Sequence, residues 1–205
     1  MANPLQTRER ILDAAERCFF QEGIGITGVD RVASEAGVAV VTLYKHFGSK
    51  DNLLRDVLSR RLDAWTAHWD AAVAAAGSAE DRLLAVFDAI ATFRAASGPT
   101  QWCCFLATAS ERPAPEAGTV DPVFDLIRQD TRLVSDRLTE LALAAGCPDP
   151  DGMAALLLVL YNGVLASLLR GEPADPIARA RTAGRLLLGA AAGLLGRSRA
   201  DLLQP

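Results

Sequence analysis

The stretch TGVDRVASEAGVAVVTLYKHFGSKDNLL, residues 27–54, decides the fold of this chain because it holds three helical patterns separated by two glycine breaks. Thr27 followed by Asp30 predicts a helix start of the capping-box kind, and apolar residues at helical spacing continue that helix to Ala36. Gly37 ends it, since glycine adopts a positive φ at little cost, and a second short helix is predicted over 40–47. Helix, glycine turn and helix predict a helix-turn-helix, which places its second helix in the DNA major groove.

Two longer helices flank this motif. Before it, apolar residues at helical spacing predict a helix over about 7–21. After it, Gly48 breaks the pattern and Ser49 is expected to cap a helix that continues to about residue 76. We therefore expect a helix-turn-helix DNA-binding domain over residues 1–50 and a larger helical domain for ligand binding and dimerisation over residues 51–205.

The segment AGVAVVTLYKHFGSKDNLL, residues 36–54, resembles the signature of the TetR family of transcriptional regulators. The matching positions form a glycine turn, an aromatic pair and a lysine at the family's offsets: Ala36, Gly37, Val38, Leu43, Tyr44, Phe47, Lys50 and Asp51. The chain departs from the pattern at Ala39, where the family often has a capping serine, and at Val41, where it often has glycine. The resemblance implies a three-helix head followed by a helical bundle that dimerises.

Composition and charge limit the kind of nucleic-acid binding that is possible. The 205 residues are 50% hydrophobic and 22% charged, with a net charge of -4, which argues against a protein that coats nucleic acid non-specifically. Acidic and basic residues are balanced in the first sixty positions. Affinity for phosphate must therefore come from the local placement of basic groups.

The rest of the chain also reads as helix, so the predicted class is all-α. Further helices are expected over 78–96, 102–109, 121–145, 149–170 and 175–195, several of them opened by Ser-x-x-Asp or Asp-Pro signals. β-Branched residues never alternate over a useful length. The last two helices carry more apolar surface than one buried face needs, which favours a homodimer interface over the alternative, a buried hairpin within a monomer.

We expect the DNA contacts to come from the second helix of the motif and from two helix starts. Thr42, Lys45 and His46 are predicted to contact DNA, with Val40 near a thymine methyl or a sugar. Thr27 and Lys50 lie at helix N-termini, where backbone N–H groups favour phosphate, and the resemblance implies contacts at such positions. Tyr44 is interpreted as partly buried in the head, with a hydroxyl that could reach a phosphate.

A ligand site is expected in the second domain, where aromatic and polar residues concentrate: Trp65, His68, Trp69, Phe93, Trp102 and Phe105. The resemblance implies that such a pocket binds a small-molecule inducer, whose identity the sequence does not reveal. For each residue taken singly, the alternative is ordinary core packing. A ligand there would tilt the helix that begins at Ser49 and change the separation of two recognition helices.

Other classes of protein lack their required residues. There is no glycine-rich phosphate loop and no Gly-x-Ser-x-Gly, and no carboxylates cluster beside a histidine, so no enzyme, cofactor or metal site is predicted.

The adjacent Cys103 and Cys104 are interpreted as buried packing rather than a thiol sensor. The four cysteines form no C-x-x-C pair and no secretory signal is recognisable, which predicts a cytoplasmic protein; the apolar runs are read as too short to span a membrane.

These features together predict a sequence-specific regulator of transcription that binds double-stranded operator DNA as a homodimer. By resemblance, it is a repressor that a ligand releases. The alternative is a helical protein–protein interaction module without DNA binding. The operator and the regulated genes lie beyond the sequence.

Overall fold

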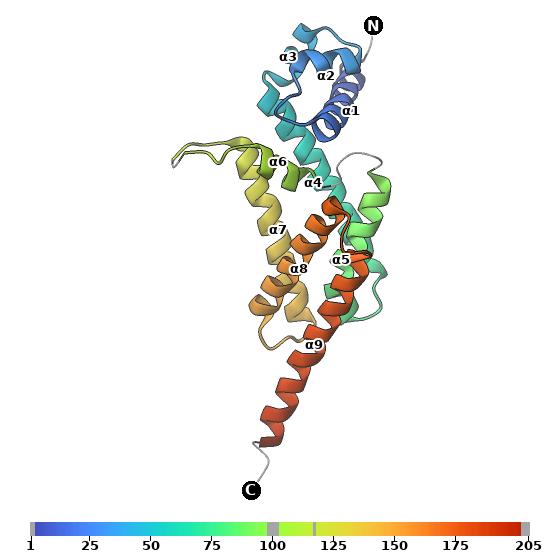
Figure 1. The fold of residues 1–205 in the computed structure, drawn as a ribbon, viewed down its shortest axis with the longest axis vertical. Coiled ribbons are helices and arrows are strands. Elements are labelled where there is room, and N and C mark those ends of the chain that lie inside the picture. Colours follow the sequence, from blue (N-terminus) through green and yellow to red (C-terminus); the bar gives the residue numbers. More distant parts are fainter. Residues whose placement is uncertain (1–2, 98–102, 117, 202–205) are drawn as a thin grey trace. The chain divides into compact units, whose positions relative to one another are not determined.

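The computed structural model describes residues 3–97, 103–116 and 118–201, with side chains up to residue 191, and its regular elements in these ranges are nine helices (Figure 1). No strand occurs among the described residues, which confirms the predicted all-α class.

The chain divides into two compact units that are each discontinuous in sequence. The first comprises residues 1–64 and 96–130, and the second comprises residues 65–95 and 131–205. This division differs from the predicted boundary after residue 50, because the fourth and seventh helices each contribute residues to both units. The predicted division into a DNA-binding and a ligand-binding domain concerns function and stays a prediction.

Three helices and the start of a fourth form the head of the first unit: α1 (Pro4–Glu22), α2 (Val29–Ala36), α3 (Val40–Phe47) and α4 (Lys50–Ala75). α1 packs against α2, and α2 against α3 (Figure 1). The helices enclose an apolar core whose members are almost inaccessible to solvent: Ile11, Leu12, Phe19, Val32, Leu43, Leu53, Leu54 and Val57. Burial of about 1.5–3 kcal/mol per large apolar side chain accounts for the cohesion of this small bundle.

The turn of the predicted helix-turn-helix has the expected geometry. Gly37 has φ 63° and ψ 41°, the left-handed conformation, and its N–H donates to the carbonyls at the end of α2. The prediction for the start of α2 is wrong in one respect. Gly28, not Thr27, is the N-cap residue, and no side chain caps this helix.

The first unit is completed by α6 (Cys104–Glu111) and by the beginning of α7 (Pro122–Ala144). The Asp121 carboxylate accepts hydrogen bonds from the backbone N–H groups of Val123 and Phe124, at 2.9 and 3.2 Å. This confirms the predicted Asp-Pro helix start, because a side-chain acceptor at the N-cap satisfies amides that lack a partner within the helix.

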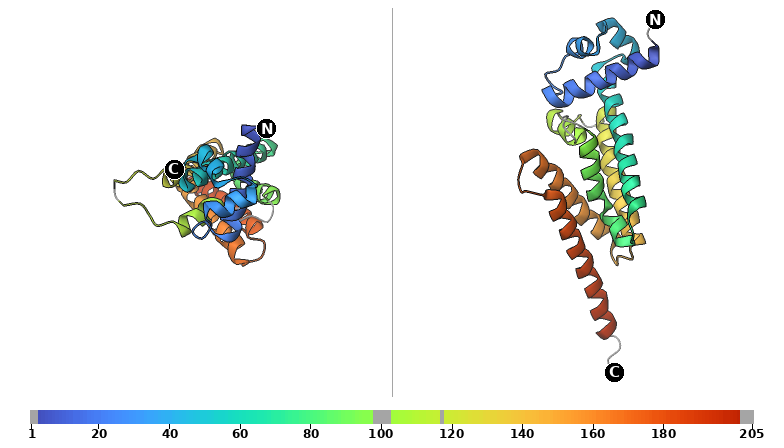
Figure 2. Two further views of the ribbon diagram at one scale, coloured as in Figure 1. Left: turned by 90° about the horizontal axis from the view of Figure 1, so that it is seen from above. Right: turned by 90° about the vertical axis from the view of Figure 1, so that its right-hand side faces the viewer.

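The second unit contains the remainder of α4 and α7 together with α5 (Ala79–Ala96), α8 (Pro150–Arg170) and α9 (Pro176–Asp201). α8 and α9 lie side by side over much of α8, as both views show (Figures 1 and 2). Gly184 permits the packing of α9, because a Cβ atom there would lie 2.5 Å from Leu84 Cδ2 and 3.3 Å from Leu157 Cδ2. The described helix α9 extends beyond its predicted end at residue 195.

The apolar stretch of α8 is longer than the apolar runs recognised in the sequence. Its length of 21 residues and a mean hydropathy of 2.0 over an 18-residue window would allow it to cross a membrane, which corrects the reading that the apolar runs are too short. An interior helix of a water-soluble bundle meets the same criterion. Several large apolar residues of α8, such as Leu156 and Val159, are nevertheless exposed in the single chain.

Candidate nucleic-acid interface and ligand site

α3 has one face in the core and one face in solvent. Leu43 and Phe47 are buried and fix the helix to the head. On the opposite face, Val40 is 37% exposed, Val41 is 61% exposed and Tyr44 is 45% exposed. These positions and the exposed Lys45 follow the helical period, so they form a continuous outward surface. The exposure of Tyr44 favours a contact role over the partly buried one that its aromatic ring suggested.

Val41 belongs to this surface although it is not among the predicted contacts. It is the more exposed of the two valines and lies in the first turn of α3. A branched apolar side chain there suits contact with a thymine methyl group, the apolar feature of the major groove. Its exposure follows from the helical spacing to Leu43 and Phe47, so the signal is present in the sequence.

The N-terminus of α3 has no side-chain cap, because Ala39 occupies the N-cap position. Acidic residues are also absent from the first turn, whereas Lys45 and His46 lie in the last turn. An uncapped N-terminus presents backbone N–H groups and the positive end of the helix dipole, a combination that favours phosphate. Thr42 and His46 are each half-buried beside this surface.

Thr27 is directed into the head, and its predicted DNA contact stays a prediction. Its side chain is buried, and its hydroxyl donates to the carbonyl of Gly23 at 2.6 Å and lies 3.2 Å from the carbonyl of Cys18. The backbone N–H of Thr27 also donates to the Gly23 carbonyl. The side chain thus stabilises the connection between α1 and α2, a tertiary role that a capping pattern does not reveal.

Lys50 likewise has an intramolecular partner. Its ammonium donates to the carbonyl of Ile24 at 2.6 Å and lies 5.9 Å from the centre of the Phe19 ring. The prediction of a phosphate contact rests on its place at a helix start. In the structure, the positive charge of Lys50 is directed to the turn between α1 and α2.

The end of α6 also contacts the turn between α1 and α2. The Glu111 carboxylate accepts from the backbone N–H groups of Ile24 and Gly25, at 2.7 and 3.1 Å. Glu111 therefore acts as a distant cap for a turn 86 and 87 residues away in sequence. Sequence reasoning missed this contact because no local pattern joins residues so far apart. The turn between α1 and α2 is held at its amides by Glu111 and at a carbonyl by Lys50.

Arg112 connects the start of α4 with the start of α7. Its guanidinium makes two hydrogen bonds with the Asp51 carboxylate, at 3.0 and 2.9 Å, and two with that of Asp121, at 3.1 and 2.9 Å. The hydrogen bonds from Arg112 lower the pKa of Asp51 below its usual value. Bidentate arginine–carboxylate pairs are more specific in geometry than single contacts. Glu111 and Arg112 thus hold the end of α6 in place against the other helices of the first unit.

Many basic groups of α1, α2 and α4 are paired with acids. Arg60 contacts the carboxylates of Asp13 and Glu16, both at 2.7 Å. Arg31 contacts Glu22 at 2.6 Å and Glu35 at 3.0 Å. Exposed pairs of this kind contribute little to stability, but they neutralise the local charge. This pairing agrees with the balanced charge of the head, in which the outward face of α3 carries the exposed Lys45.

Four of the predicted ligand residues come together in the second unit. The ring centre of Trp65 lies 5.8 Å from that of Trp69, 5.7 Å from that of Phe93 and 5.9 Å from that of Tyr161, and Phe93 in turn contacts His68 at 5.5 Å. We call these five residues the aromatic cluster. Tyr161, from α8, is not among the predicted ligand residues.

The two tryptophans of the aromatic cluster have buried indole nitrogens without a hydrogen-bond partner among the described residues. Tryptophan N–H is a donor only, and a buried donor without an acceptor costs about 1–3 kcal/mol. The Arg137 guanidinium lies 4.5 Å from the Trp69 ring centre and also pairs with Asp70. The cluster is thus an apolar site with two unused donors and a cation against one ring.

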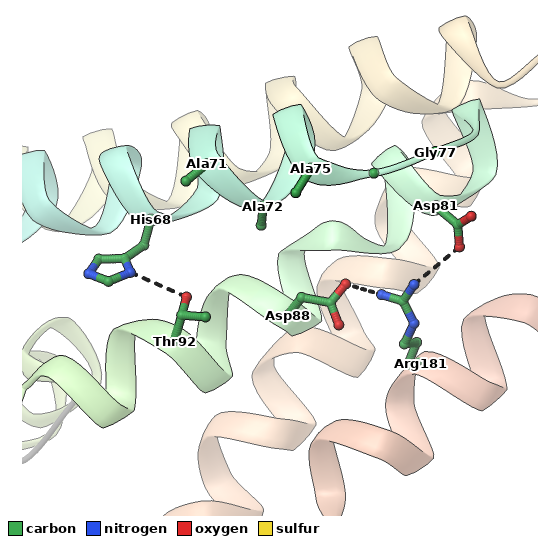
Figure 3. Close-up of a pocket in the computed structure, with 10 residues that line it drawn as sticks. His68, Ala71, Ala72, Ala75, Gly77, Asp81, Asp88, Thr92 and Arg181 are labelled. Atoms are coloured by element: carbon green, nitrogen blue, oxygen red, sulfur yellow. Dashed lines mark hydrogen bonds and ion pairs between the residues drawn. The ribbon is translucent and has the colours of Figure 1, made fainter.

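A cavity of about 580 Å³ borders the cluster at His68 (Figure 3). Ala71, Ala72 and Ala75 of α4 form one wall, where short side chains leave the hollow open. Across the cavity, Arg181 of α9 binds the carboxylates of Asp81 and Asp88, the former at 3.1 Å. A hydrogen bond of 3.2 Å joins His68 Nδ1 and Thr92 Oγ1.

The remaining predicted ligand residues do not join the cluster. Phe105 is buried on α6 in the first unit, and Trp102 lies outside the described residues. Burial raises the pKa of the Cys103 thiol to about 12 and also raises that of Cys104, so neither thiol is activated as a nucleophile. Among the described residues, no group of three or more His, Cys, Asp and Glu side chains is placed to hold a metal ion.

Comparison with known sequences gives matches to part of the chain. Residues 11–57 match the model of a family described as bacterial regulatory proteins, tetR family. A curated HTH-type transcriptional regulator from Staphylococcus aureus (strain USA300) is 36% identical over 64 residues. The aligned region is 31% of this chain and 35% of that protein, so the chain spans only a minor part of this relative.

Comparison with solved structures covers most of the chain. A TetR-family transcriptional regulator from Streptomyces coelicolor is 27% identical, with a TM-score of 0.79 over 91% of this chain and 96% of that one. A TetR transcriptional regulator from Chloroflexus aurantiacus has a TM-score of 0.71 over 90% of this chain and 94% of that one. Its identity of 22% supports the fold alone.

Proposed function

The chain belongs to the TetR family of bacterial regulatory proteins, and from this premise we propose that it is a homodimeric, sequence-specific DNA-binding regulator of transcription. We further propose that it works in the cytoplasm, not as an enzyme but as a repressor that a small-molecule inducer releases from operator DNA.

The outward face of α3 is the observation that carries the proposal. Val40, Val41, Tyr44 and Lys45 are exposed together on a short helix whose opposite side is buried. The proposed contact set is these four with Thr42 and His46. Lysine and histidine serve phosphate or base acceptors, and the valines serve thymine methyl groups. Thr27 and Lys50 leave the set because their polar groups have intramolecular partners.

Apolar residues exposed on α8 and α9 support the homodimer. Leu156, Val159 and Leu169 are exposed on α8, and Leu186 is exposed on α9. A Cβ atom added at Gly163 or at Gly189 would meet no neighbouring atom within 4 Å, so both helices offer room for a close partner. Two-fold symmetry would supply a second copy of α3, because dimeric helix-turn-helix proteins read two half-sites about 34–36 Å apart or multiples of it.

Ligand release requires that the ligand site and the head are coupled. α4 begins in the first unit, beside α3 in sequence, and carries Trp65, His68 and Trp69 in the second unit. A ligand that displaces these side chains would move α4 and thereby change the separation of the two α3 helices. A coupling free energy of about 1–3 kcal/mol, or roughly 5–150-fold in affinity, is usual for such a switch.

A gel shift with the DNA immediately upstream of the chain's own gene tests the proposal. We expect retention of a discrete complex by the wild type and a loss of at least about tenfold in affinity for Lys45→Glu or Val41→Asp. Arg132→Glu, the same charge reversal on an exposed residue of α7, is the control and should bind normally. Equal affinity of all four proteins for this DNA would refute DNA recognition by α3 and favour the protein–protein interaction module.

A further inference from the structure

We propose that the inducer is a planar aromatic compound with a hydrogen-bond-acceptor oxygen, which the indole N–H groups of Trp65 and Trp69 recognise. This inference rests on the proposed ligand response and adds the chemical class of the ligand. Tryptophan N–H can only donate, so the partner that both nitrogens lack must supply an acceptor. Phenylalanine would fill an apolar core without this requirement.

The ring faces of the aromatic cluster determine the shape of the expected ligand. Trp65 contacts Trp69 and Tyr161 with tilted rings, and contacts Phe93 edge-on at 75°. α4, α5 and α8 thus each present a ring to one small volume within the second unit. Offset and edge-on contacts at these separations are the ones that aromatic rings prefer, and a flat aromatic ligand makes contacts of the same kind.

The charge beside Trp69 determines the polarity of that ligand. The Arg137 guanidinium lies over the Trp69 ring, so the indole carries a cation on one face. A positive charge near a donor strengthens its attraction for an electron-rich oxygen and disfavours an organic cation. The site therefore suits a ketone, quinone or phenolate oxygen and not an ammonium group.

The cavity in Figure 3 meets the aromatic cluster at His68. His68 forms one end of that cavity and also contacts Phe93, which contacts Trp65. The single hydrogen bond to Thr92 is the only polar contact that the structure describes for the His68 ring. The volume of about 580 Å³ is within the range of small-molecule sites, and His68 is the member of the aromatic cluster that lines it.

Three pairs of commercially available probes isolate the acceptor oxygen: acetophenone with ethylbenzene, 1-tetralone with tetralin, and 9-fluorenone with fluorene. Each pair has nearly the same shape and differs by one carbonyl oxygen. We expect the carbonyl compound of at least one pair to bind the full-length protein about tenfold or more tightly than its hydrocarbon, measured by quenching of tryptophan fluorescence and by calorimetry. Trp65→Phe and Trp69→Phe keep an aromatic ring but remove the N–H, so each should reduce this preference and leave the hydrocarbon affinity nearly unchanged.

The outcomes separate the ligand class from the proposed function. Equal affinities within all three pairs, or no binding by any probe, would overturn the proposed ligand class, and the wild-type comparison gives this result even where a tryptophan variant does not fold. A carbonyl preference that both tryptophan variants retain would overturn the role of the indoles. The gel shift without ligand tests DNA binding independently, so its failure would remove the regulator proposal while leaving the binding result for the aromatic ketone intact.

Discussion

Glu111 and Lys50 show how single side chains from distant parts of the sequence define one turn of the head. Glu111 accepts from two backbone amides of the turn between α1 and α2, and Lys50 donates to a carbonyl of the same turn. The turn sets the angle between α1 and α2, and α2 in turn packs against α3. Glu111 and Lys50 can therefore control the position of the outward face of α3 through this turn.

We predict that Glu111→Ala lowers the free energy of unfolding by about 1–2 kcal/mol, because the amides of Ile24 and Gly25 lose their acceptor. Operator affinity should fall with it, since the turn is less well fixed. Glu111→Gln, which keeps a side-chain oxygen, should restore part of both. Glu116→Ala removes an exposed carboxylate nearby in sequence and serves as the control in urea denaturation and DNA titration. A Glu111→Ala variant as stable as the control would show that the contact contributes nothing.

Lys50 and Lys45 offer a matched comparison of two lysines. Lys50→Met should lower stability by about 1 kcal/mol and leave the salt dependence of DNA binding unchanged, because its ammonium serves the Ile24 carbonyl. Lys45→Met should leave stability unchanged and reduce the slope of log affinity against log salt by about 1, the effect of one lost phosphate contact. DNA titrations at four salt concentrations decide the point; a reduced slope for Lys50→Met would restore the phosphate contact that its sequence position suggested.

At the scale of elements, local signals predict helix starts better than tertiary roles. Ser49, Ser78, Asp121 and Asp149 carry capping patterns, and each accepts a backbone N–H of the helix that it precedes. Such signals are readable because donor and acceptor lie within three residues of each other. Thr27 carries a similar pattern, yet tertiary hydrogen bonds direct its hydroxyl elsewhere.

A candidate site that lies on a single helix can be predicted from the sequence, whereas a site built from several helices cannot be predicted completely. The outward face of α3 follows from helical spacing alone, so Val40, Tyr44 and Lys45 can be named from the sequence, and the same spacing includes Val41. The aromatic cluster draws on three helices, and its member Tyr161 cannot be assigned before the packing of α8 is known. The role of Glu111 depends on the end of α6 meeting a turn far away in sequence, which no periodicity encodes.

Within α7, Asp130 is predicted to make stability depend on pH. Burial raises the pKa of its carboxyl to about 7, above the ordinary value of 3.8. The folded chain therefore binds this proton more tightly than the unfolded chain, so the contribution of Asp130 is favourable at low pH and is lost as pH rises through about 7. We expect Asp130→Asn to gain about 2 kcal/mol at pH 8, less than the roughly 4 kcal/mol for three pKa units, because the side chain retains some contact with solvent.

Urea denaturation at pH 5 and pH 8 measures this effect. The gain at pH 5 should be less than half of that at pH 8, because the stability is lost progressively between the unfolded pKa of 3.8 and the folded pKa of about 7. Asp136→Asn, on an exposed position of the same helix, is the control and should change stability little at either pH. The same change for Asp130→Asn at both pH values would mean that its carboxyl is not kept protonated by burial.

At the scale of the whole molecule, dimerisation would reconcile an apolar α8 with a regulator that works in water. By its composition, α8 could span a bilayer. Only 33% of its 18-residue apolar stretch is buried within one chain, so the rest needs a further cover. A second copy supplies it symmetrically, because in a two-fold interface each chain contributes the same patch. The arrangement of the glycines agrees with this: Gly184 faces the chain's own Leu84 and Leu157, whereas Gly163 and Gly189 have open space.

We predict that Leu186→Glu converts the proposed dimer to a monomer, because it would place a charge in the proposed apolar contact between copies. Leu143→Glu on α7 is a close control, since the two leucines are 70% and 68% exposed in the single chain and receive the same substitution. Light scattering after size exclusion, repeated over a hundredfold range of concentration, should give a dimer for the wild type and for Leu143→Glu. The Leu186→Glu variant should also lose tight operator binding while keeping its helical content, because one α3 contacts only one half-site. A wild type that remains a monomer over the whole range would refute the paired arrangement of α3, and dimers of Leu186→Glu as stable as the control would move the interface away from α9.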